Sequence, residues 1–138
     1  MTDRHSSSNH IRRPARILII EDEALIALMI EEMIRDMGYR ISGMAHDLAV
    51  TRKELAKRNF DAVLLDISLQ GRHHPEIADY LLETNLPFAF VTGYDYLAEP
   101  RHKNVPVLQK PFNPNQLRIL LEQLVGPVSS SDETARIA

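Results

Sequence analysis

The chain of 138 residues has no cysteine, no long apolar run and only a small excess of negative charge. The absence of cysteine excludes disulfide bonds and thiol chemistry. No apolar run approaches the roughly 20 residues that a membrane-spanning helix needs. The formal net charge of -3 gives no broad attraction to nucleic acid or to anionic lipid. We therefore expect a soluble protein whose partners include neither nucleic acid nor membrane.

The two ends of the chain differ from its body. Residues 1–14 and 126–138 are polar and lack apolar periodicity, and we expect both to be mobile tails. Arg12 and Arg13 precede the first apolar stretch, but acids follow that stretch too soon for a secretory signal peptide, so a cytoplasmic location is expected. The body, residues 15–125, is long enough for one domain with a hydrophobic core and contains no linker or repeat.

Within the body, apolar runs alternate with helical patterns. The runs predict five strands, at residues 16–20, 39–45, 61–67, 87–93 and 105–109. Helices are predicted at residues 24–37, 47–58 and 75–83, and from Pro114 onward. Near-continuous apolar strands separated by helices indicate an α/β fold, with a five-stranded parallel sheet covered by helices on both faces.

Several helix ends and one helix face can be assigned from single residues. Asp47 and Asn113 are predicted N-caps, and Gly38 ends the first helix. Acidic and basic side chains occupy one face of the first helix, and its apolar stripe consists of Ile26, Met29, Ile30, Met33 and Met37. The last helix directs four leucines to the core: Leu117, Leu120, Leu121 and Leu124.

Polar residues lie at the carboxyl ends of four of the five predicted strands. Glu21 and Asp22 follow the first strand and Lys110 follows the fifth, whereas Asp66 and Thr92 lie near the ends of the third and the fourth. Ligands of parallel sheets bind beyond the carboxyl ends of the strands, so these side chains are expected to converge on one rim. A divalent cation relieves the repulsion among carboxylates, and oxygen ligands suit Mg²⁺. Such a cation and a lysine would neutralise a phosphoryl group, for which Asp66 can act as the nucleophile.

Glu21-Asp22, Asp66, Thr92 and Lys110-Pro111, in this order over residues 16–125, resemble the receiver domain of bacterial two-component response regulators. The resemblance implies a CheY-like (flavodoxin-like) fold and a switch that catalyses its own phosphorylation and dephosphorylation rather than an enzyme with a separate substrate. Asp66 would be the phosphoacceptor for a sensor histidine kinase.

The same resemblance implies a role for each site residue. Asp22 would bind Mg²⁺ directly and Glu21 through a water molecule, and Asp66 and the backbone carbonyl of Ser68 would complete the protein ligands. Lys110 would pair with the phosphoryl oxygens. Thr92 would turn its hydroxyl toward the phosphoryl group and so convert a local charge into a surface rearrangement.

The sequence departs from the common receiver pattern near strands four and five. Val107 stands where receivers usually carry an aromatic switch residue, three positions before the lysine. The interval from Thr92 to Lys110 is 18 positions and contains two prolines, so we expect the helix between the fourth and fifth strands, the fourth helix of the receiver pattern, to be short or distorted. The runs "PFAFVTGYD" and "DISLQG" resemble the Phe-x-Thr-Gly-Tyr (FATGUY-type) subgroup, in which Tyr94 is the candidate switch. Receivers commonly dimerise through this altered face, and we expect a monomer or a weak homodimer.

Only about thirteen residues follow the last helix, too few for a DNA-binding or enzymatic module. We therefore expect a single-domain response regulator that acts by protein–protein contact or by phosphorelay through a histidine phosphotransfer protein. The subgroup resemblance implies a kinase of the HWE or a related group. A phosphate sink and a non-phosphorylated scaffold receiver remain alternatives. A small aspartate-dependent phosphatase is less favoured, because Ser68 stands where such enzymes carry a second acid.

Three further polar residues are given ordinary roles. Glu23 is expected to cap or solvate the first turn of its helix. His73 and His74 are expected to be solvated loop residues rather than metal ligands.

Overall fold

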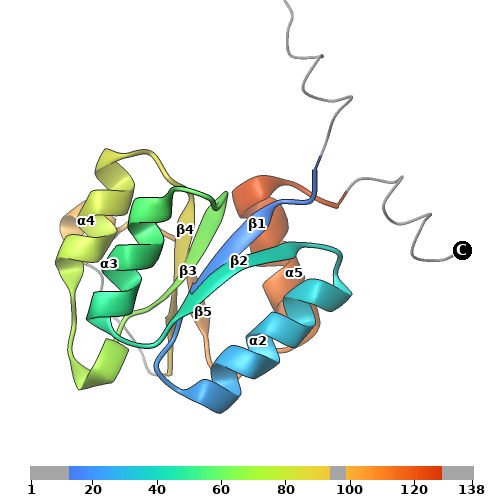
Figure 1. The fold of residues 1–138 in the computed structure, drawn as a ribbon, viewed down its shortest axis with the longest axis horizontal. Coiled ribbons are helices and arrows are strands. Elements are labelled where there is room, and N and C mark those ends of the chain that lie inside the picture. Colours follow the sequence, from blue (N-terminus) through green and yellow to red (C-terminus); the bar gives the residue numbers. More distant parts are fainter. Residues whose placement is uncertain (1–12, 94–98, 129–138) are drawn as a thin grey trace, which may run out of the picture.

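The structure, a computed structural model, describes residues 13–93 and 99–128. The elements of this part of the chain are, in order, β1 (Arg16–Ile20), α2 (Ala24–Asp36), β2 (Arg40–Ala45), α3 (Leu48–Lys57), β3 (Ala62–Asp66), the 3₁₀ helix η2 (Leu69–Gly71), α4 (Pro75–Glu83), β4 (Phe88–Thr92), the 3₁₀ helix η3 (Pro100–His102), β5 (Val107–Gln109) and α5 (Pro114–Val125) (Figure 1).

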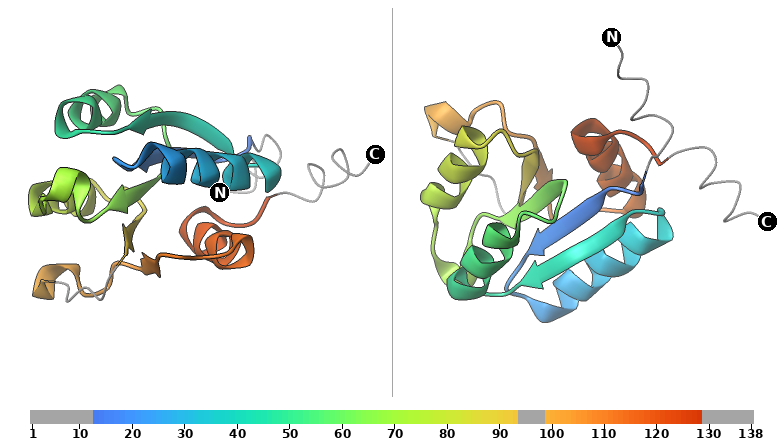
Figure 2. Two further views of the ribbon diagram at one scale, coloured as in Figure 1. Left: turned by 90° about the horizontal axis from the view of Figure 1, so that it is seen from below. Right: turned by 45° about the horizontal axis from the view of Figure 1, so that its top comes forward.

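The five strands form one parallel sheet in the order β2-β1-β3-β4-β5. Helices α2 and α5 cover one face of this sheet, and α3 and α4 cover the other (Figures 1 and 2). The predicted α/β architecture is therefore confirmed. After β1 the chain continues into α2 on one face of the sheet, whereas after β3 it continues into α4 on the other face. Ligand sites in such sheets lie between two neighbouring strands whose connections run to opposite faces.

Two hydrophobic clusters, one on each face of the sheet, form the core. Side chains of β1 alternate between them: Ile17 and Ile19 pack with α2 and α5, whereas Leu18 and Ile20 pack with α3 and α4. Alternation is the normal geometry of a strand, and burial on both faces explains why the strand is apolar throughout.

The predicted helix caps are present. Asp47 accepts the N–H of Val50 at 2.8 Å, and Asn113 forms a reciprocal capping box with Gln116 at the start of α5. Gly38 has a φ of 96°, which favours glycine, and follows the last turn of α2. These local signals were readable from sequence because each of them satisfies backbone groups within three residues.

One assignment in α2 is wrong. Met29 was placed on the apolar stripe, but its side chain is 53% exposed, and the buried residues of this helix are Ala27, Ile30 and Ile34. Apolar residues occupy more than half of the helix circumference, so periodicity alone did not fix which face is buried. Leu25 and Leu28 are also exposed, whereas Ile26 and Met33 are partly buried against the core.

The connection from β4 to β5 contains little regular structure in its described residues. There, η3 is a single 3₁₀ turn, in agreement with the prediction of a short or distorted helix between the fourth and fifth strands. Strand β5 has three residues rather than the predicted five. Pro106 has no N–H to donate, although its carbonyl accepts the N–H of Phe90 at 2.9 Å. No helix in the described part of the chain has the length and hydrophobicity that a membrane span requires.

Candidate functional site

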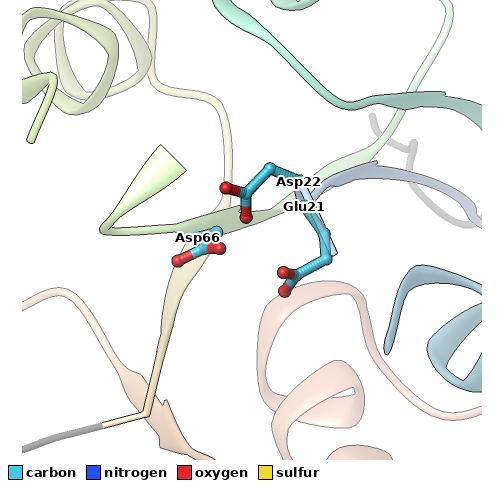
Figure 3. A group of neighbouring side chains, drawn as sticks. All are labelled: Glu21, Asp22 and Asp66. Carbon is cyan, nitrogen blue, oxygen red and sulfur yellow. The ribbon is translucent and has the colours of Figure 1, made fainter. Parts of the chain in front are cut away.

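Three acidic side chains meet at the carboxyl ends of β1 and β3. The two strands pair in parallel, with Ile20 opposite Leu65, so the next residue of each chain segment, Glu21 after Ile20 and Asp66 after Leu65, lies at the same rim. One carboxylate oxygen from each of Glu21, Asp22 and Asp66 lies within 4.8 Å of the other two (Figure 3). Residues that are more than forty positions apart in sequence thus form one cluster, called here the acidic cluster.

Two members of the acidic cluster are deeply buried. Glu21 is 1% exposed and Asp66 is 6% exposed, whereas Asp22 is only partly buried. The second Glu21 carboxylate oxygen, Oε2, accepts the N–H of Glu23 at 3.2 Å, and Asp66 Oδ1 accepts the N–H of Ser68 at 2.9 Å. Buried carboxylates are costly unless they are paired, so a cation must balance part of this charge.

Lys110, which follows β5, supplies that cation. Its Nζ lies 3.0 Å from Glu21 Oε1, 3.5 Å from Glu23 Oε1 and 3.8 Å from Asp66 Oδ2. The backbone N–H of Lys110 donates to the carbonyl of Thr92 at 2.7 Å, which fixes the base of the side chain against β4. Burial lowers the pKa of Lys110, but the neighbouring carboxylates raise it more, and the resulting pKa is above its ordinary value.

The contact between Lys110 and Glu23 was not predicted from the sequence. Glu23 does occupy the N-cap position of α2, but its side chain makes no capping hydrogen bond and pairs with Lys110 instead. The two residues are 87 positions apart, and no local pattern links them.

Asp66 is strongly perturbed. The pKa of its carboxyl is raised from 3.8 to about 7; burial is the main cause and the nearby Glu21 adds to the rise, whereas the Ser68 N–H and Lys110 oppose it. A carboxyl group with such a pKa favours either a proton or a cation beside it.

Thr92 is the last residue of β4, and Ser68 comes two residues after the end of the neighbouring strand β3. Asp66 of β3 is paired with Val91 of β4, so Thr92 is the next residue along and is 2% exposed. The Ser68 carbonyl accepts the N–H of Gly71 at 3.0 Å. Tyr94, the candidate switch, lies outside the described residues.

The acidic cluster fits a hard divalent cation. It offers only oxygen donors, and its three carboxylates exceed the single charge of Lys110. Among residues 13–93 and 99–128, no second group of three histidine or acidic side chains is close enough to hold a metal. His73 is exposed, and His74 Nδ1 lies 3.5 Å from Glu76.

Comparison with known proteins extends this picture. A family model described as the response regulator receiver domain matches residues 17–122. The chain is 32% identical over 116 residues to the phyllosphere-induced regulator PhyR of Methylorubrum extorquens, covering 78% of this chain and 42% of PhyR. It is 34% identical over 120 residues to the transcriptional regulatory protein PdtaR of Mycobacterium tuberculosis, covering 82% of this chain and 58% of PdtaR. The chain thus spans about half the length of these two relatives.

Solved structures give the same result. SdrG from Sphingomonas melonis Fr1 has a TM-score of 0.73 and 32% identity, over 83% of this chain and 99% of SdrG. The receiver domain of the Erythrobacter litoralis PhyR response regulator has a TM-score of 0.71 and 28% identity, over 85% of this chain and 97% of that domain. The chain belongs to the response regulator receiver domain family.

Proposed function

We propose that this chain is a phosphorylation switch in which Asp66 accepts a phosphoryl group from a histidine kinase in the presence of Mg²⁺. The observation that carries the proposal is the meeting of Glu21, Asp22 and Asp66 within 4.8 Å, with Lys110 against the same cluster. A purely structural role gives no reason to bury repelling carboxylates at the rim of the sheet.

The transfer is a displacement at phosphorus. An oxygen of the ionised Asp66 carboxylate forms a bond to phosphorus as the bond from phosphorus to the kinase imidazole nitrogen breaks, and the imidazole leaves with the electron pair and gains a proton. Asp22 and Asp66, with the Ser68 carbonyl, would hold Mg²⁺, and Glu21 would act through a water molecule. When bound, Mg²⁺ would neutralise charge on the phosphoryl oxygens.

Lys110 and Thr92 would act on the product. Lys110 Nζ already lies 3.8 Å from Asp66 Oδ2, so a short movement of its side chain would allow it to donate to a phosphoryl oxygen. That movement would separate it from Glu23, whose pairing with Lys110 is the weaker of its two glutamate contacts. Thr92, at the end of the neighbouring strand, would donate its hydroxyl to the same group.

The proposal extends to the organisation of the protein. Residues 15–125 would form the receiver domain of a cytoplasmic response regulator, which signals by protein contact or by phosphorelay through a phosphotransfer protein. The family match over residues 17–122 supports the domain assignment. An HWE-type kinase and a FATGUY-type subgroup remain predictions from the signature around Thr92.

Trifluoroberyllate, a stable mimic of a phosphoryl group on a carboxylate, tests the site without a kinase. In ¹⁹F NMR, we expect bound fluoride signals with wild type and Mg²⁺, and none when Mg²⁺ is omitted or when Asp66→Asn is used. Asp36→Asn makes the same change at an exposed position on α2 and should bind as wild type does. If wild type gave no bound signal at saturating Mg²⁺, the proposal would be wrong.

A further inference from the structure

The loop after β3 turns back over the acidic cluster and donates to its oxygens. The N–H of Gln70 donates to Asp22 Oδ2 at 2.7 Å, and the N–H of Gly71 donates to the Ser68 carbonyl at 3.0 Å. The N–H of Ser68 donates to Asp66 Oδ1 at 2.9 Å. Three backbone donors of one loop therefore reach one oxygen of each group that the proposed function assigns as a direct ligand of the cation.

The conformation that makes these contacts is unfavourable for one of its residues. Gln70 has φ 55° and ψ 35°, in the left-handed region, and Gly71 follows with a φ of 75°. A residue with a Cβ populates the left-handed region less readily than the right-handed one, by roughly five- to thirtyfold. The glycine has no such penalty, so the strain lies at Gln70.

One residue of the loop is buried in the core, and the two residues after it are exposed. Leu69 is 1% exposed and belongs to the hydrophobic cluster under α3 and α4, whereas Gln70 and Gly71 are exposed. The Gln70 peptide can therefore turn away from Asp22 while Leu69 stays in the core. Such a local change disturbs no buried contact of the Gln70 side chain.

We propose that this loop competes with the divalent cation for Asp22, and that residue 70 sets the balance. An N–H carries partial positive charge, so it and a divalent cation repel each other at the same carboxylate oxygen. The cation would displace the Gln70 N–H and release the left-handed conformation. Gln70 is thus a positioning residue whose backbone, rather than its side chain, tunes the affinity for Mg²⁺; this inference rests on the proposed function.

Substitutions at residue 70 should change the affinity in opposite directions. Gln70→Gly makes the left-handed conformation easier, stabilises the loop on Asp22 and should weaken Mg²⁺ binding about fivefold. Gln70→Val makes it harder, because a β-branched side chain is a poor left-handed residue, and should tighten binding by a similar factor. Gln70→Ala removes the long side chain with little change in backbone preference, and should bind as wild type does.

Calorimetric titration of the full chain with Mg²⁺ measures these affinities. Asn85→Gly is the matched control, because Asn85 also has a left-handed φ, of 57°, but lies after α4, away from the cluster. It should leave Mg²⁺ affinity unchanged. Hydrogen exchange gives a second readout: the Gln70 N–H should exchange faster at saturating Mg²⁺, since it loses its acceptor.

The outcomes separate this inference from the proposed function. Opposite shifts for glycine and valine, with faster exchange of the Gln70 N–H, would support loop competition. Equal affinities in wild type and all three residue-70 variants, or unchanged exchange of that N–H, would overturn the inference and leave the phosphoacceptor proposal standing. No Mg²⁺ binding by wild type would overturn both.

Discussion

Replacing Asp66 with asparagine should stabilise the metal-free fold at neutral pH. The wild-type carboxylate is 6% exposed and lies in a cluster where acidic groups outnumber the one lysine. Asparagine keeps an oxygen for the Ser68 N–H and adds an amide that can donate to Glu21. The variant therefore resembles the protonated carboxyl group without its dependence on pH.

The magnitude follows from the pKa of Asp66. Its rise from 3.8 to about 7 corresponds to at most about 4 kcal/mol, at about 1.4 kcal/mol for each pKa unit. Because the folded pKa lies above the unfolded one, this stability is fully present below about pH 4 and is lost as pH rises through about 7. The difference between variant and wild type should therefore be near zero at pH 4 and approach its full size by pH 8.

Urea denaturation in the presence of a chelator, at a series of pH values, measures this difference. Asp36→Asn, on the exposed surface of α2, should change the free energy of unfolding by less than about 0.5 kcal/mol at every pH. Saturating Mg²⁺ should narrow the gap, because the cation stabilises wild type by mass action. A variant that is no more stable than wild type at pH 8, or a gap that is independent of pH, would refute the reasoning.

Three other substitutions test separate contacts. Lys110→Met leaves the buried Glu21 without its cation and should lower the free energy of unfolding by on the order of 3 kcal/mol in metal-free urea titrations, with partial recovery in Mg²⁺. Arg101 and His102 hold the pKa of Asp79 at about 2, so that contribution is present above about pH 4 and is lost as pH falls through 2. Asp79→Asn should therefore lower the melting temperature at pH 7 and lower it much less at pH 2. Asn113→Ala removes the capping box of α5 and should cost about 1 kcal/mol in urea titrations, whereas Asn115→Ala, inside the same helix, should not.

The sheet and the convergence of the acidic residues could be predicted because they depend on order along the chain. Once the strands are parallel, the residue after each strand reaches the same rim, whatever the intervening sequence. Glu21 and Asp66 could therefore be placed together without any knowledge of their contacts. The caps at Asp47 and Asn113 were equally readable, since a cap involves neighbouring residues only.

Features that depend on tertiary contacts could not be predicted. The face of α2 that becomes buried depends on how this helix packs against the sheet and α5, and that packing leaves Met29 exposed. His102 is 1% exposed, donates its Nε2–H to the Asp79 carboxylate at 2.8 Å and packs on Phe90, yet it comes from a polar stretch with no apolar pattern. The Gln70 contact with Asp22 joins residues 48 positions apart. It is made by a backbone N–H, so the identity of the side chain at residue 70 does not predict it.

Intact mass after incubation with Mg²⁺ and acetyl phosphate tests the central claim, that Asp66 is a phosphoacceptor. We expect a single phosphoryl adduct on wild type that requires Mg²⁺, is released by base as an acyl phosphate is, and is absent from Asp66→Asn. An adduct that persists in Asp66→Asn, or the absence of any adduct on wild type that binds Mg²⁺, would contradict the account.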